Sequence, residues 1–109
     1  MRYSLALLFL LIAAALEAGG DALMRSGMYG TTSRQRVAFI LAGALVLAAY
    51  GYTVNALPWD FGRLLGTYIA FFFIVAQLIA WIAFGQRPTV SLLVGGTLIL
   101  AGGYIVSRG

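Results

Sequence analysis

The sequence contains no cysteine and no histidine, and these two absences exclude whole classes of chemistry. Without cysteine the chain has no disulfide and no thiol nucleophile, and without histidine it has no imidazole to ligate a metal ion. Acidic residues are also scarce, because only three occur among 109 residues, and all seven basic residues are arginine. The sequence therefore predicts neither a metal site nor a bound cofactor.

Hydrophobic residues, by contrast, make up 62% of the chain and charged residues only 9%. A soluble domain of this length could not bury so much apolar surface. Four apolar runs at 4–24, 37–57, 64–84 and 90–106 account for most of the sequence. At ~1.5 Å per residue the first three can cross a bilayer, and the fourth lies at the short limit of about 17 residues. The sequence predicts an all-α integral membrane protein of the inner (plasma) membrane, with one multi-pass domain at 1–109 formed as a four-transmembrane-helix bundle.

Each arginine lies at a helix end or in a loop, where its charge can meet lipid headgroups, so the net charge of +4 does not indicate a nucleic-acid partner. With four spans, Arg2, Arg63 and Arg108 lie on the side of the termini, and Arg25, Arg34, Arg36 and Arg87 lie on the other. A difference of one charge leaves the orientation undecided by the positive-inside rule. Either Arg34 and Arg36 dominate and fix one orientation, or the protein inserts both ways and pairs as an antiparallel homodimer with a site at the midplane.

Glu17 is the unusual residue, because it places a carboxyl group inside the apolar run 4–24, about 5 Å from the bilayer centre. A charge there costs at least ~2.5–3.5 kcal/mol, so the group must be neutral, paired or in a water-filled cavity. Apolar surroundings favour the protonated form of a carboxyl group. Such a group can hold a proton and release it to an arriving cation. The alternative is a protonated carboxyl that only hydrogen-bonds another helix.

Asp21 and Arg25 follow Glu17 at a spacing of four residues, which places all three on nearly the same helix face. Asp21 is expected about 11 Å from the midplane, near the headgroup boundary. Two interpretations stay open for it. Asp21 either forms an interfacial ion pair with Arg25, or it tunes Glu17 and guides a substrate at the mouth of a cavity.

Two further sets of residues are candidates for binding and for association. Tyr68 lies inside the third run, with Tyr50 or Tyr52 from the second, and aromatic rings of this kind can bind an organic cation through their π faces. In the fourth run four positions share a face within about 100°; they are Gly95, Leu98, Ile99 and Gly102. Flat glycines beside large aliphatic residues predict a dimer seam, and close packing within one subunit is the alternative.

Three segments resemble those of a known family. Residues 17–25, Glu-Ala-Gly-Gly-Asp-Ala-Leu-Met-Arg, resemble the first-helix signature of the small multidrug resistance family, in which an embedded Glu is followed by Gly, Leu-Met and a basic residue. Residues 84–87 are similar to its third connection, and residues 95–102 are similar to its fourth-helix dimerisation motif. The third run lacks the usual Tyr-Ala-x-Trp block, and Gly62-Arg63 followed by Tyr68 is closer to the YnfA-like branch.

The resemblance implies membership of the drug/metabolite transporter superfamily and antiparallel four-helix dimers that exchange protons for cationic compounds. It would give Glu17 the role of binding either a proton or the substrate, and it would place Gly95, Leu98, Ile99 and Gly102 at the subunit contact.

Together, these observations predict a small secondary transporter that exports cationic or amphiphilic small molecules in exchange for protons. Its partners would be a second copy of the chain and the surrounding lipids. A non-transporting accessory or scaffold subunit and a lipid or amphiphile flippase are the alternatives. An enzyme is not expected, because the two carboxyl groups lie one turn apart on one helix and no nucleophile–base pair accompanies them.

Overall fold

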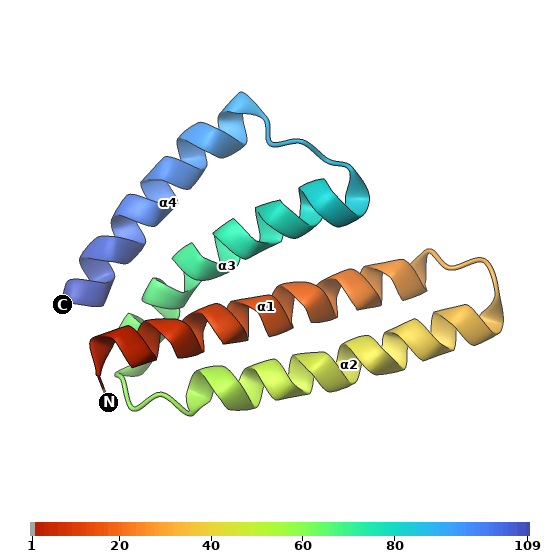
Figure 1. Ribbon diagram of the computed structural model, residues 1–109, viewed down its shortest axis with the longest axis horizontal. Helices are drawn as coiled ribbons and strands as arrows, with labels where there is room; N and C mark the ends of the chain where they lie inside the picture. The colour runs from red at the N-terminus through yellow and green to blue at the C-terminus, as the bar shows by residue number, and fades with distance from the viewer. Residues whose placement is uncertain (1) are drawn as a thin grey trace.

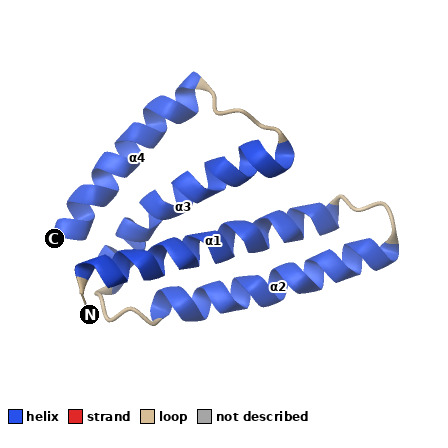
Figure 2. Ribbon diagram, in the orientation of Figure 1, coloured by secondary structure: helices blue, strands red, loops and turns tan. Residues whose placement is uncertain are grey.

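A computed structural model of the chain describes residues 2–109, and the regular secondary structure of this range is entirely α-helical (Figure 2). The helices are α1 (Tyr3–Met28), α2 (Ser33–Asn55), α3 (Phe61–Phe84) and α4 (Val90–Arg108). Each of the four is long and apolar enough to cross a membrane. The predicted all-α, four-helix architecture is therefore confirmed, and it indicates a multi-pass membrane protein.

Each helix is longer than the apolar run that predicts it. α1 continues to Met28 and α2 already begins at Ser33, so the loop between them shrinks to residues 29–32. The Thr32 side chain caps α2 by accepting a hydrogen bond from the Gln35 N–H at 3.1 Å. Hydropathy marks only the lipid-facing part of a span, whereas a helix continues until a capping residue satisfies its free backbone groups. α3 also begins ahead of its apolar run, at Phe61, although the Asp60 side chain before it makes no capping hydrogen bond.

The four helices form an open row in the spatial order α2–α1–α3–α4 (Figure 1). α1 packs against α2 and α3, while α4 packs mainly against α3 and diverges from it toward the α3–α4 loop (Figure 1). At the end of the termini α4 also contacts α1, where the Tyr3 hydroxyl and the Ser107 Oγ are 2.7 Å apart. The row measures 48 × 34 × 18 Å, so it is thin in one direction. One chain by itself therefore leaves broad helix faces uncovered, and the expected bundle is open.

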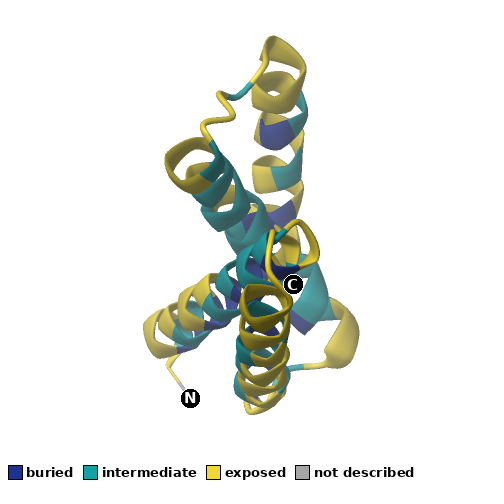
Figure 3. Ribbon diagram, turned by 90° about the vertical axis from the view of Figure 1, so that its right-hand side faces the viewer, coloured by how far each residue is buried: buried dark blue, intermediate teal, exposed yellow. Residues whose placement is uncertain are grey.

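The core lies where α1 meets α3 and the end of α2 (Figure 3). Its buried members are Ala6, Leu10, Ala13, Ala14, Val54, Leu57, Leu64 and Tyr68. Alanines on one face of α1 let the neighbouring helices approach closely, which is how helices associate in a lipid environment. Large residues such as Leu45 and Ile82 are 74% and 82% exposed, as expected for side chains that face acyl chains.

The connection from α3 to α4 reverses the chain at Gly85, whose φ of +66° is in the left-handed region. There the Gln86 N–H donates to the Ala80 carbonyl at 2.9 Å and the Gly85 N–H to the Trp81 carbonyl at 3.0 Å. This is the hydrogen-bond pattern of a Schellman motif, which satisfies the last carbonyl groups of a helix. The reversal places both termini at one end of the molecule and the loops 29–32 and 85–89 at the other (Figure 1).

The α1–α2 contact depends on glycines. A Cβ atom built on Gly43 would lie 2.9 Å from the Gly20 carbonyl oxygen and 2.9 Å from the Met24 nitrogen. Both neighbours belong to the backbone of α1, so neither can move without shifting the whole helix. The two backbones are therefore in direct contact at this point, and α1 and α2 form a tight hairpin.

We predict that Gly43→Ala destabilises the protein by about 1–3 kcal/mol through overpacking. Gly51→Ala on the same helix is the matched control, because a Cβ there meets no atom within 4 Å. Unfolding of the purified protein by sodium dodecyl sulfate, followed by circular dichroism, measures both variants. Equal stability of the two variants would show that the α1–α2 contact is looser than the structure places it.

Candidate functional site

Glu17 of α1 forms a hydrogen bond with Tyr68 of α3. The Tyr68 hydroxyl donates to Glu17 Oε1 at 2.7 Å, and the Ala13 carbonyl oxygen lies 3.4 Å from the same hydroxyl. Tyr68 is 4% exposed and belongs to the core, whereas Glu17 is half-buried. The buried tyrosine thus provides the partner that a carboxyl group needs at this depth.

Tyr50 of α2 completes an aromatic wall beside the carboxyl group. The Tyr50 and Tyr68 ring centroids are 5.5 Å apart, and the Tyr68 and Phe72 centroids are 6.1 Å apart, with tilted planes in both pairs. The structure therefore brings together Glu17, Tyr68 and Tyr50 from three different helices. Tyr52, the alternative to Tyr50, is 84% exposed and lies away from the site.

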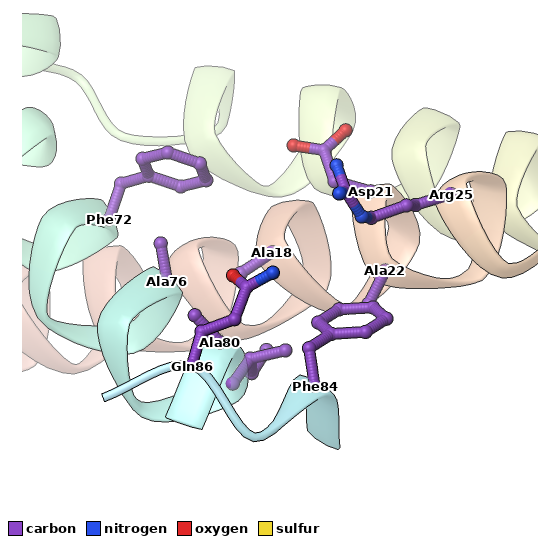
Figure 4. Close-up of a pocket in the computed structure, with 10 residues that line it drawn as sticks. Ala18, Asp21, Ala22, Arg25, Phe72, Ala76, Ala80, Phe84 and Gln86 are labelled. Atoms are coloured by element: carbon purple, nitrogen blue, oxygen red, sulfur yellow. The ribbon is translucent and has the colours of Figure 1, made fainter. Parts of the chain in front are cut away.

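A cleft of about 290 Å³ lies between α1 and α3, and Phe72 is one of the residues that line it (Figure 4). We call it the α1–α3 cleft; its lining consists of Ala18, Asp21, Ala22 and Arg25 from α1, Phe72, Ala76, Ile79, Ala80 and Phe84 from α3, and Gln86 from the loop. Ala18 follows Glu17 in the chain. Glu17 itself does not line the cleft; it lies one helical turn before Asp21 on the same helix, and Phe72 separates the cleft from Tyr68.

Asp21 and Arg25 lie at one rim of the α1–α3 cleft (Figure 4). The Arg25 guanidinium carbon is 5.7 Å from the Phe84 ring centroid and 5.5 Å from that of Tyr29. Among the described residues Arg25 forms no ion pair with Asp21, so the first interpretation of Asp21 is not what the structure presents. Arg25 is instead held by cation–π contacts, and the Asp21 carboxylate remains exposed at the rim.

The residues of the predicted dimer seam, Gly95, Leu98, Ile99 and Gly102, lie on α4, away from Glu17. The glycines of α4 divide into two sets. A Cβ on Gly95 or Gly102 meets no atom within 4 Å, and Leu98 is 71% exposed. A Cβ on Gly96 or Gly103, by contrast, would lie 2.5 Å from Phe73 or Ala70 of α3. Packing within one chain therefore uses Gly96 and Gly103, and the face of Gly95, Leu98, Ile99 and Gly102 is left without close packing at its glycines.

Sequence reasoning did not single out Phe72, Phe84 and Gln86 as cleft residues. A signal for the first two exists, because the α3 residues Tyr68, Phe72, Ala76, Ala80 and Phe84 recur at intervals of four. Residues at this spacing form one ridge on a helix. Gln86 reaches the cleft only through the turn at Gly85, and no local pattern predicts that.

No known protein-family model, no curated protein and no solved structure matches this chain. Residues 2–109 also contain no group of three or more acidic side chains that could together hold a metal ion. The chemistry open to the site is therefore that of a carboxyl group, two tyrosine hydroxyls and aromatic faces, which can bind protons and cations.

We predict an energetic coupling between Glu17 and Tyr68 that a double-mutant cycle measures. Tyr68→Phe removes the donor and Glu17→Met removes the acceptor, while both changes keep similar volumes. We expect the two effects on unfolding free energy to be non-additive by about 0.5–2 kcal/mol, the range for one hydrogen bond in this setting. In the control cycle Tyr52→Phe replaces Tyr68→Phe. Its effect on the unfolding free energy should add to that of Glu17→Met, because Tyr52 is exposed. Additivity in both cycles would contradict the hydrogen bond.

Proposed function

We propose that this protein is a small secondary transporter that exports cationic or amphiphilic small molecules in exchange for protons. The observation that supports the proposal most strongly is the Glu17 carboxyl group, held by the buried Tyr68 hydroxyl at 2.7 Å beside a cleft within the membrane-crossing part of the molecule. Ionisable groups inside a membrane are costly and are characteristic of ion and proton pathways. The resemblance of residues 17–25 to the small multidrug resistance signature points the same way.

In the proposed exchange, a proton and a cation compete for the carboxyl group of Glu17. When the carboxyl is ionised, it accepts the Tyr68 O–H and can bind a cation through its second oxygen. When it is protonated, it can donate to the Tyr68 oxygen, and the Tyr68 O–H can turn toward the Ala13 carbonyl. Tyr68 therefore keeps a hydrogen bond in both states, which lets Glu17 change its charge without leaving an unsatisfied polar group in the core.

A substrate would reach Glu17 through the α1–α3 cleft. The exposed carboxylate of Asp21 lies at its rim, and the rings of Phe72 and Phe84 form part of its walls. A carboxylate attracts a cation at the entrance, and aromatic and alanine surfaces accept its apolar part. The lining therefore favours an organic cation or an amphiphile over a small hydrated ion.

Two copies arranged as an antiparallel homodimer would complete the transport pathway. One chain is a row only 18 Å deep in its thinnest direction, which is too thin to surround a substrate. Glu17 lies close to the middle of α1 (Tyr3–Met28), so antiparallel copies would place both carboxyl groups at similar depth near the midplane. The uncovered face of Gly95, Leu98, Ile99 and Gly102 on α4 would form the contact between them.

We predict that an organic cation displaces protons from the purified protein. Tetraphenylphosphonium added to detergent-solubilised wild type in weak buffer should lower the pH, because cation binding expels the proton of Glu17. Glu17→Gln should release no protons, since a side-chain amide does not ionise and has no acidic proton that a cation could displace. Asp60→Asn is the matched control and should behave as wild type, because Asp60 precedes α3 and does not line the α1–α3 cleft.

If neither tetraphenylphosphonium nor a smaller guanidinium cation displaces protons from the wild type, coupled exchange is excluded as the function. Intact cellular activity in Glu17→Gln would then favour a scaffold or accessory subunit. Proton release of equal size in wild type and Glu17→Gln would mean that another group carries the proton.

We predict that Gly102→Leu lowers the dimer fraction at least tenfold at equal protein-to-detergent ratio. A leucine there would hold two α4 helices apart at the proposed seam. Gly51→Leu is the control, because Gly51 is equally free of neighbours within 4 Å but lies on α2. Analytical ultracentrifugation in density-matched detergent measures both. A dimer that survives Gly102→Leu unchanged would place the subunit contact elsewhere.

A further inference from the structure

A second groove, of about 200 Å³, lies between α3 and α4 and reaches α1 at the end that holds the termini. We call it the α3–α4 groove. Leu7, Phe71, Ile74 and Leu100 provide apolar walls. It shares no lining residue with the α1–α3 cleft, so the two cavities are separate.

Thr67 in this groove carries a buried hydroxyl group without a partner. The residue is 2% exposed, and among the described residues its Oγ1 makes no hydrogen bond. A hydroxyl buried without a hydrogen bond costs about 1–3 kcal/mol. A ligand in the groove that offers an acceptor oxygen would remove this cost.

Two arginines contact residues that line the groove at the end nearest the termini. Arg63 donates from Nε and Nη2 to the Ser107 carbonyl at 3.2 and 2.7 Å, and its guanidinium lies 3.9 Å from the Trp59 ring centroid. Three of its five N–H groups remain available for another acceptor. Arg108 lies 5.5 Å from the ring centroid of Tyr3, which itself lines the groove.

The depths of these groups match the layers of a membrane lipid. Thr67 follows Arg63 by one helical turn, so it lies about 6 Å deeper along α3. The headgroup and interfacial layer of a bilayer leaflet is about 5–8 Å thick. When the phosphate of a phospholipid is at the level of Arg63, the ester carbonyl groups of the same lipid are therefore at the level of Thr67.

We propose that the α3–α4 groove binds one anionic phospholipid from the leaflet on the side of the termini. Its phosphate contacts Arg63 and Arg108, an ester carbonyl accepts the Thr67 O–H, and an acyl chain fills the apolar walls. Charge favours this occupant, because a phosphate complements Arg63 and Arg108, each of which contacts a residue that lines the groove.

The test compares thermal unfolding of the purified protein with added phosphatidylglycerol and with phosphatidylcholine of the same acyl chains. A bound ligand raises the unfolding midpoint in proportion to its affinity, so wild type should gain several degrees more from phosphatidylglycerol. Native mass spectrometry should show one phosphatidylglycerol molecule retained per chain. Thr67→Val, Arg108→Gln and Leu100→Trp should each lose most of the difference between the two lipids.

Ile69→Trp is the matched control for the groove-filling variant. Ile69 is 54% exposed on α3 and lines neither the groove nor the cleft, so the lipid difference should persist. Glu17→Gln should also keep it, because lipid binding and cation exchange use separate cavities. Equal effects of the two lipids on wild type would overturn the proposal, as would a lipid difference that survives in Thr67→Val and Arg108→Gln. A loss of dimer in Leu100→Trp without any lipid preference would assign the groove to a second copy.

Discussion

The hydrogen bond between the Tyr68 hydroxyl and the Glu17 carboxyl group is the interaction on which the rest of the site depends. It joins α1 to α3 near the middle of α1 and gives an otherwise costly carboxyl group a defined partner. Because Tyr68 is almost fully buried, its hydroxyl is fixed by the packing of the core and not by the substrate. Glu17 lies one helical turn before Asp21, which lines the α1–α3 cleft, and in the proposed exchange protons and cations compete for the Glu17 carboxyl group.

The packing of the row follows from small residues placed at different faces of the helices. Gly43 brings the α1 and α2 backbones into contact, whereas Gly96 and Gly103 of α4 receive the side chains of Phe73 and Ala70 of α3. α2 and α4 therefore use small residues against their neighbours, and both leave another face free. In a bilayer such free faces meet lipid or a second copy, since no hydrophobic force drives helices together there.

The two ends of the molecule are built differently, although both are rich in arginine. At the end of the termini, Arg63 anchors the last turn of α4 through the Ser107 carbonyl and lies over Trp59. At the other end, Arg25 is held by Phe84 and Tyr29, and α3 and α4 diverge (Figure 1). One end is thus tied together around a groove suited to a lipid, and the other is open beside the cleft that contains Asp21.

Hydropathy and residue spacing are local properties, and they were enough to predict four apolar spans, the all-α class and a carboxyl group deep in the first span. Hydropathy located the start of α2 less well, because Thr32 caps that helix at Ser33, ahead of the apolar run that begins at 37. The structure was needed to show that Glu17 bonds Tyr68, that Arg25 lies on aromatic rings, and which α4 glycines face α3. Those contacts depend on how each helix is rotated about its axis relative to its neighbour, and the residue pattern of a single helix does not predict that rotation.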